Sequence, residues 1–207
     1  MSAVTEAVGL DVRKACVRKA SMRDIHPVLR LINSYAADGV MLPRTEFEMS
    51  ENIRDFSVVY SGAQLVGCGA LHFYTPTTAE VRSLAVDPAL KTHGIGRAIV
   101  EGLEREAAEN QLHAIFAFTY VPQFFRKLGF YEIERGELPL KAWKDCLRCP
   151  KFQACDEIAM LKRLRPDAVI GAGTHAASEL VQLPRLSSFG QGLADFPMAS
   201  ERIGNSS

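Results

Sequence analysis

The segment that most constrains the fold is 81–97, where an apolar run passes into a glycine-containing turn and then an amphipathic stretch. Asp87 and Pro88 end the run, because proline has no amide hydrogen for a sheet and restricts the residue before it. Gly94 and Gly96 follow, and glycine lets the backbone approach a ligand closely. The sequence therefore predicts a strand, a tight turn and a helix whose first amides face negative charge.

The start of this predicted helix is a candidate pyrophosphate site. Four of its amides are expected to be free for an anion, those of Ile95, Gly96, Arg97 and Ala98. The pattern is neither the G-x-G-x-x-G of dinucleotide folds nor the Gly-Lys-Ser/Thr loop of nucleoside triphosphatases. An ordinary turn between a strand and a helix is the alternative interpretation.

Two segments together resemble the GCN5-related N-acetyltransferases (GNAT). Lys91 stands three residues before Gly94, in a pattern similar to that family's acetyl-CoA motif, Arg/Gln-x-x-Gly-x-Gly/Ala. Residues 122–130 resemble the family's later helix, which ends in Leu-Gly-Phe beside the CoA arm. The resemblance implies an α/β fold, with a mixed central sheet that splays into a V and is flanked by helices. It also implies acetyl-CoA as co-substrate.

The resemblance assigns the acetyl-CoA site to the end of the strand, the turn, the start of the helix and one later aromatic residue. These positions are Leu84, Val86, Lys91, Gly94, Ile95, Gly96, Arg97, Ala98 and Phe125. Many relatives have a tyrosine at the position of Phe125, where it protonates the departing thiolate. Phenylalanine cannot do so, and Tyr120, Thr119 or water is expected to donate that proton instead.

Further segments narrow the likeness to the short, single-domain bacterial N-acetylglutamate synthases. Residues 39–44 resemble their substrate loop, 67–71 their central strand and 79–86 their catalytic strand. This likeness implies transfer of an acetyl group to the α-amine of L-glutamate, at the head of arginine biosynthesis. Two alternatives are open: acetylation of another amino acid, a polyamine or a protein N-terminus, and an acetyl-CoA sensor without turnover.

The chemistry suggests roles for several charged residues. Glu80 is the candidate base, because it is charged within an otherwise apolar strand; a salt bridge with Arg82 on the same strand face is the alternative. Arg44 is the candidate clamp for the α-carboxylate, since a guanidinium binds a carboxylate in a bidentate fork, and a solvated loop arginine is its alternative. Arg82, Thr119 and Lys144 complete the predicted substrate site.

The cysteines Cys146, Cys149 and Cys155 have spacings compatible with a metal site. A fourth zinc ligand would come from Asp156, His72 or His113. Zinc, a redox-sensitive dithiol and reduced structural cysteines are all open interpretations.

The composition favours one catalytic domain in the cytoplasm. Lys plus Arg and Asp plus Glu number 24 each, so no overall charge favours nucleic acid or an anionic membrane. The sequence has no run approaching the ~18 apolar residues of a membrane span, and an odd number of cysteines, five, argues against a disulfide scaffold. We expect a weak leader at 1–11, the catalytic domain at 12–165, a flexible, disordered tail at 166–207, and a homodimer as one possible assembly.

Alternation, helical periodicity and turn residues predict the individual elements. Strands are expected at 16–20, 56–60, 64–74, 79–86, 113–120, 130–133 and 157–164. Helices are expected after Ser21 and Thr45, each with an acidic residue three positions on as in a capping box, and at 94–109 and 122–128.

Overall fold

The structure is a computed structural model, and it describes residues 16–138, 151 and 154–165. The predicted leader and tail lie outside these residues, so the predicted domain limits stay a prediction. Among the described residues, every helix is too short or too polar to reach across a membrane.

The described part of the chain contains one seven-stranded mixed sheet with the order β1-β2-β3-β4-β5-β7-β6. The strands are β1 (Arg18–Lys19), β2 (Phe56–Ser61), β3 (Gln64–Phe73), β4 (Thr78–Val86), β5 (Ala114–Thr119), β6 (Tyr131–Glu132) and β7 (Ile158–Arg163). β4 and β5 run parallel, and every other neighbouring pair is antiparallel. The predicted mixed sheet is therefore confirmed.

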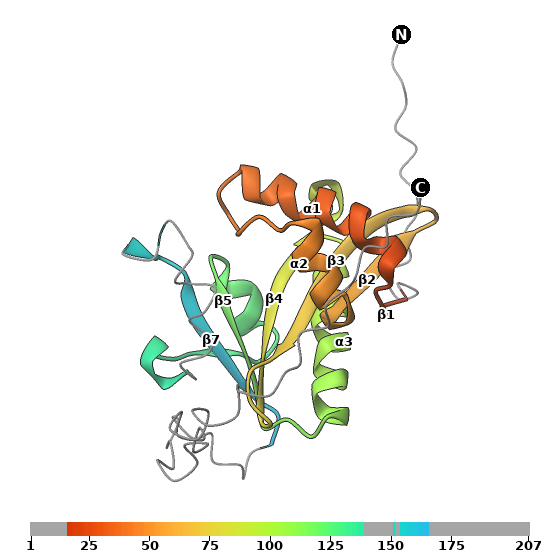
Figure 1. Cartoon of the computed structure of the whole chain (residues 1–207). Helices are drawn as coiled ribbons and strands as arrows, with labels where there is room; N and C mark the ends of the chain where they lie inside the picture. Colours follow the sequence, from red (N-terminus) through yellow and green to blue (C-terminus); the bar gives the residue numbers. More distant parts are fainter. Residues whose placement is uncertain (1–15, 139–150, 152–153, 166–207) are drawn as a thin grey trace, which may run out of the picture. The chain divides into compact units, whose positions relative to one another are not determined.

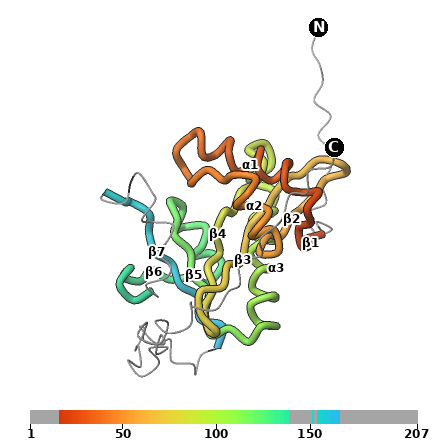
Figure 2. Tube along the Cα trace, in the orientation of Figure 1, coloured from red at the N-terminus to blue at the C-terminus, as the bar shows by residue number. Residues whose placement is uncertain are grey.

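Helices cover both faces of this sheet. They are α1 (Ile25–Ala37), α2 (Glu46–Asn52), α3 (Ile95–Glu109) and α4 (Pro122–Arg126). The apolar sides of α1 and α2 share one core cluster with β2, β3 and β4, whereas α3 packs into a second cluster on the other face. Figures 1 and 2 show α1 and α2 close together and α3 apart from them.

The parallel contact between β4 and β5 is short. Only Thr78–Glu80 pair with Ala114–Phe116. Beyond that point β4 keeps pairing with β3, and β5 keeps pairing with β7. The two strands lie side by side at one end and apart at the other (Figure 1), so the predicted V-shaped splay is present.

Glycines on β3 let α3 lie very close to the sheet. A Cβ atom at Gly67 would come 2.8 Å from the Ile95 side chain, and one at Gly69 would come 2.9 Å from Ile99. These distances are shorter than real Cβ contacts, so the helix sits where only glycine leaves room. The close packing fixes the start of α3 against the sheet.

Most of the predicted helices and strands match the structure, but β1 and β6 are shorter than the strands predicted at their positions. The predicted strand 16–20 shrinks to β1, although the amide of Ala20 still donates to Phe56 O at 2.9 Å. The predicted strand 130–133 shrinks to β6. Both lie at the ends of the sheet order, where a strand has only one neighbour to hold its backbone.

The predicted capping box before α1 is confirmed, and it is part of a buried polar cluster. The Asp24 carboxylate accepts hydrogen bonds from the Ser21 amide at 2.7 Å, from both Arg18 Nη atoms at 2.8 and 2.9 Å, and from the Tyr60 hydroxyl at 2.8 Å. The Arg18 guanidinium is the main reason that the pKa of Asp24 lies well below its usual value. The ionised carboxylate thus joins the start of α1 to β1 and β2.

We expect Asp24→Asn to lower the free energy of unfolding at pH 7 by about 2–3 kcal/mol, because charged hydrogen bonds are lost. A lowered pKa in the folded state gives stability that is present above the unfolded value, near 3.8, and is lost as the pH falls toward the folded value. The gap between wild type and variant should therefore be constant from pH 7 to 5. Below 3.8 it should narrow by up to about 1.4 kcal/mol per pH unit. Urea unfolding at each pH measures it, and Asp38→Asn, an exposed carboxylate, is the control.

Candidate functional site

A bulge in β4 lies beside the splay. Cys68 pairs with Ala85 and Ala70 pairs with Arg82, so Ser83 and Leu84 together oppose the single residue Gly69. Ser83 has φ of 51°, which is the left-handed region that bulges use and that serine rarely adopts. The bulge re-aims the backbone of β4 where its distance from β5 grows.

The predicted anion site at the start of α3 has the expected backbone geometry. Gly94 is the N-cap of α3 with φ of 77°, a conformation that glycine adopts without steric cost. Among the described residues, no backbone hydrogen bond uses the amides of Ile95, Gly96 or Arg97. These three amides and the helix dipole favour an anion in front of the helix.

One of the predicted free amides is not free. The amide of Ala98 donates to Gly94 O at 3.0 Å, which is the first hydrogen bond inside the helix. Because Gly94 is the N-cap, Ala98 is the fourth helical residue, and only the three residues before it lack an intrahelical acceptor. The prediction of an exposed amide at Ala98 is therefore wrong.

Side chains around the turn hold the start of α3 in place and make the surface in front of it basic. The Lys91 ammonium lies 4.9 Å from the centre of the Tyr35 ring, and the Tyr35 hydroxyl donates to Val86 O at 2.6 Å. A Cβ atom at Gly96 would lie 3.4 Å from Phe124, so the first turn of α3 packs closely on α4. Arg97 is exposed and lies 3.6 Å from Glu101. The cradle defined by 91–97 is thus basic and held by α1, α4 and the end of β4.

Gly94→Ala should weaken acetyl-CoA binding. A side chain in the left-handed region costs about 1–2 kcal/mol, which corresponds to a roughly 5- to 30-fold rise in the dissociation constant if the turn shifts to relieve the strain. Gly62→Ala is the matched control, because Gly62 also has positive φ, 57°, but lies in the β2–β3 hairpin. Calorimetric titration with CoA measures both; equal affinities of the two variants would contradict the role of the cradle.

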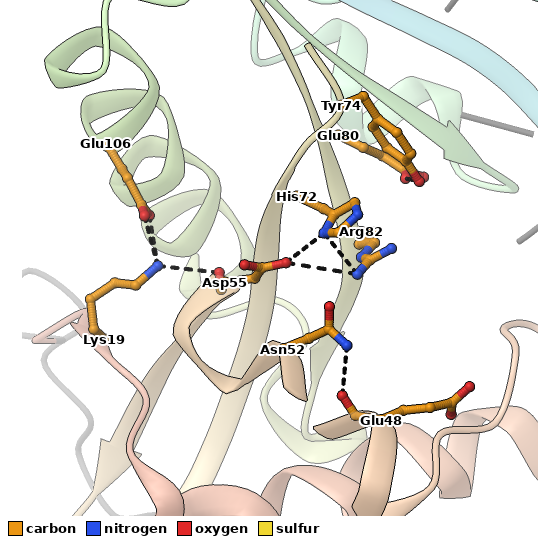
Figure 3. Close-up of polar contacts among 9 residues, drawn as sticks. All are labelled: Lys19, Glu48, Asn52, Asp55, His72, Tyr74, Glu80, Arg82 and Glu106. Carbon is orange, nitrogen blue, oxygen red and sulfur yellow. Dashed lines mark hydrogen bonds and ion pairs between the residues drawn. The ribbon is translucent and has the colours of Figure 1, made fainter. Parts of the chain in front are cut away.

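A polar strip lies on the face of the sheet that carries α1 and α2. It consists of Asp55, His72, Tyr74, Glu80 and Arg82 (Figure 3). His72 on β3 is directly opposite Glu80 on β4. The strip is mostly shielded from solvent, since Glu80 is 9% exposed and the Arg82 side chain 10%. Buried polar groups need partners, and these residues supply them to one another.

Two sets of contacts organise the strip. The Tyr74 hydroxyl donates to Glu80 Oε2 at 2.9 Å. His72 Nδ1 lies 2.6 Å from Asp55 Oδ2 and 3.0 Å from Arg82 Nη2, and Arg82 Nη2 lies 3.7 Å from Asp55 Oδ2. The rings of His72 and Tyr74 meet edge to face at 4.8 Å, which joins the two sets. The candidate base therefore lies in one of two polar sets that are in contact through the His72 and Tyr74 rings.

The loop that carries Arg44 is fastened to α1 by its backbone. Asn33 accepts from the Arg44 amide at 2.9 Å and donates to Arg44 O at 3.0 Å. The capping box predicted at Thr45 is confirmed, since the Glu48 amide donates to its hydroxyl oxygen and the Glu48 carboxylate accepts from the Thr45 amide. Helix α2 thus begins directly after the predicted clamp.

The residues at the end of β5 differ in what they can donate. Thr119 is buried, and its hydroxyl oxygen accepts from the Val121 amide at 3.0 Å. The Tyr120 hydroxyl lies 3.4 Å from Lys151 Nζ, and burial raises the pKa of Tyr120, so its proton is retained at neutral pH. Phe125 is buried between Phe124 and Phe130, with ring centres 5.2 and 5.1 Å away. It is a core residue in this structure.

Part of the predicted site lies outside the described residues, namely Lys144, Cys146 and Cys149. Cys155 is described, and its thiol faces Glu157 at 3.8 Å. Within the described ranges no group of three metal-ligating side chains is present. His72, one candidate for a fourth zinc ligand, binds Asp55 instead. The zinc hypothesis stays a prediction.

Comparison with known proteins identifies the family. Residues 25–136 match the Acetyltransferase (GNAT) family, and this match covers the splay, the cradle and the polar strip. The chain belongs to this family. Its similarity to an uncharacterized N-acetyltransferase of Chlorobaculum tepidum is 44% identity over 72% of this chain and 96% of the relative. An amino-acid acetyltransferase of Mycobacterium tuberculosis is 37% identical over 64% of this chain and 77% of that relative.

Solved structures agree with this assignment. The Mycobacterium tuberculosis protein Rv2747, solved in complex with CoA and NLQ, has a TM-score of 0.63 and 30% identity, over 72% of this chain and 99% of that one. N-acetylglutamate synthase from Neisseria gonorrhoeae has a TM-score of 0.67 and 24% identity over 73% of this chain and 35% of that one, which shows a shared fold. The GNAT domain of this chain is an acetyl-CoA-dependent acetyltransferase domain.

Sequence reasoning missed two members of the polar strip, Asp55 and Tyr74, and considered His72 only as a zinc ligand. One signal was available, because His72 and Tyr74 alternate with Leu71 and Phe73 along a strand, so the two polar residues share a face. Asp55 gave no comparable signal, since its proximity to His72 depends on how β2 pairs with β3.

Proposed function

We propose that this protein transfers the acetyl group of acetyl-CoA to the α-amine of L-glutamate. The observation that carries the proposal is the buried carboxylate of Glu80, two residues from Arg82 on a polar strip beside the splay, in a chain similar to an amino-acid acetyltransferase. An amino acid brings both an amine to deprotonate and a carboxylate to bind. The strip offers Glu80 for the amine and Arg82 for a carboxylate, and Arg44 in the loop before α2 is assigned as the clamp for the α-carboxylate.

The first chemical task is to remove a proton from the acceptor. An amine that titrates two units above the working pH costs about 3 kcal/mol to deprotonate, at about 1.4 kcal/mol per unit. Glu80 takes this proton, directly or through a water molecule, and the hydrogen bond from Tyr74 orients its carboxylate. The neutral amine then attacks the thioester carbonyl, and the backbone near Val86 in the splay stabilises the oxyanion.

The second task is to release the thiolate. Phe125 has no proton to give, whereas Tyr120 directly follows the end of β5, the strand that diverges from β4. Burial raises the pKa of Tyr120, so its hydroxyl is protonated but is a weaker acid than a free tyrosine. Lys151 donates to the hydroxyl oxygen at 3.4 Å, which favours release of the proton. We assign Tyr120 as the donor to the thiolate. A thiol is already a fair leaving group, so this donor contributes less than the base.

Glu80→Gln should lower kcat by about 100-fold or more, because it keeps the side-chain shape but cannot accept the proton. The acetyl-CoA dissociation constant should stay within twofold, since Glu80 lies on the polar strip and not at the cradle. Steady-state thiol release and calorimetry measure the two quantities. An unchanged kcat would refute Glu80 as base.

Arg44→Ala should raise the KM for L-glutamate about 10- to 100-fold, the equivalent of one lost charge-assisted hydrogen-bonding group. The KM for acetyl-CoA should stay unchanged. Arg105→Ala, an exposed arginine on α3, is the matched control. An equal loss of activity toward an amine without a carboxylate would count against Arg44 as clamp.

The deciding experiment is thiol release from acetyl-CoA by the purified full chain, with L-glutamate and then with each other amino acid or a polyamine. Glutamate-dependent release establishes the proposed activity, and adding arginine then tests feedback. Release with another amine alone keeps the acetyltransferase and overturns the substrate. CoA binding without release for any acceptor favours an acetyl-CoA sensor.

A further inference from the structure

The polar strip occupies an unusual position in the core. On the same face of the sheet lie two apolar clusters, one under α1 and α2 and one around Phe116 and Leu138. Tyr74 packs against the second cluster and also donates to Glu80. Polar side chains gathered between two apolar clusters cost desolvation free energy, which a purely structural face would avoid with apolar residues. The strip therefore points to a task beyond packing.

The contacts around His72 define which of its atoms carries a proton. A carboxylate accepts hydrogen bonds and cannot donate them, and a guanidinium only donates. With Nδ1 only 2.6 Å from Asp55 Oδ2, a lone pair on Nδ1 would face negative charge, so Nδ1 carries the proton and donates it to Asp55. With that proton on Nδ1, the 3.0 Å contact between His72 Nδ1 and Arg82 Nη2 joins two donors and is not a hydrogen bond. Arg82 is therefore held by the Asp55 carboxylate, 3.7 Å away, and His72 acts on Arg82 by orienting that carboxylate.

Asp55 itself is firmly placed. It ends a 3-10 turn, Ile53–Asp55, and the next residue begins β2. Lys19 Nζ donates to Asp55 O at 3.2 Å and reaches the Glu106 carboxylate on α3 at 2.8 Å, as Figure 3 shows. The Asp55 carboxylate is thus a fixed point to which His72 and Arg82 are oriented.

We propose that Asp55 and His72 are positioning residues that hold the Arg82 guanidinium beside Glu80 for the carboxylate of the acceptor. The proposal rests on the proposed function, in which Arg82 binds that carboxylate. A free arginine side chain loses up to about 2 kcal/mol of rotamer entropy when it is fixed. Asp55 and His72 fix it before the acceptor arrives, so this cost does not reduce acceptor affinity. Neither residue needs to touch the acceptor.

Three variants of the full chain test this assignment. His72→Leu removes the imidazole, His72→Asn keeps an N–H donor near the position of Nδ1, and Asp55→Asn keeps the shape of the carboxylate without its charge. Glu51→Gln, an exposed carboxylate on α2, is the control. The measurements are kcat, the KM for L-glutamate, the KM for acetyl-CoA and the dissociation constant of CoA.

We expect His72→Leu and Asp55→Asn to raise the KM for glutamate about 10- to 100-fold, the range for loss of a charge-assisted contact. The acetyl-CoA KM and the CoA dissociation constant should stay within twofold, and His72→Asn should recover most of the loss. A parallel rise of both KM values, a fall of kcat alone, or equal defects in His72→Asn and His72→Leu would overturn the positioning role. Asp55→Asn, which is nearly isosteric, keeps the test available if His72→Leu does not fold.

The wild-type acceptor profile separates this proposal from the proposed function. If the wild type acetylates a different amino acid, the glutamate assignment fails, and the same variants assayed with that amino acid still test the positioning role. If it acetylates only amines that carry no carboxylate, both proposals fail. With L-glutamate dimethyl ester as acceptor, the variants should lose their disadvantage, because the ester has no carboxylate for Arg82; a disadvantage of the same size would overturn the positioning role.

Discussion

The early end of the pairing between β4 and β5 is the constraint on which the rest of the site depends. Three residue pairs hold the strands together, and then each strand continues with its other neighbour. Backbone groups inside a protein need partners, so a sheet that opens in its middle requires a ligand, a side chain or water along the opening. The bulge at Ser83, with its positive φ, turns β4 where the gap begins. The opening begins at Glu80, the last residue of β4 that pairs with β5.

The candidate acetyl-CoA site and the candidate acceptor site are both arranged along β4, one beyond its end and the other on its earlier part. The cradle is built beyond the end of β4, where Gly94 starts α3 and three amides face outward. The polar strip uses side chains from the earlier part of β4, on the face opposite α3. An acetyl donor held by backbone amides and an acceptor held by charged side chains can therefore meet along one strand. Substitutions in one region should leave affinity in the other nearly unchanged.

The side chains of the strip are arranged so that each of them lies close to another member of the strip. Asp55 lies close to both His72 and Arg82, and Tyr74 contacts both His72 and Glu80. A change at His72 therefore acts first on Asp55 and, through it, on Arg82, although His72 is neither the candidate base nor the candidate carboxylate ligand. Networks of this kind are worth more than their separate hydrogen bonds, because each member orients the next.

The sequence by itself determined the elements with strong local signals. The capping boxes at Ser21 and Thr45, the glycine-marked start of α3 and the strand that bears Glu80 all depend on neighbours within a few positions, and all are present. The family pattern also predicted the mixed sheet and its splay. The amide of Ala98 shows the limit of this reasoning, because one residue of uncertainty in the N-cap changes which amides are free.

Only the tertiary structure decided how distant residues meet. Asp55 precedes β2, His72 lies in β3 and Arg82 lies in β4, so their contact depends on the register of two strand pairings. A shift of one residue in either register would turn His72 or Arg82 to the opposite face. The short β2–β3 turn restricts part of that register. Local sequence does not show the irregularities in the two pairings or the apolar residues that α1, α2 and α3 bury on the two faces of the sheet, and these settle the rest. The cradle is a local structure, and the polar strip is a product of the assembled sheet.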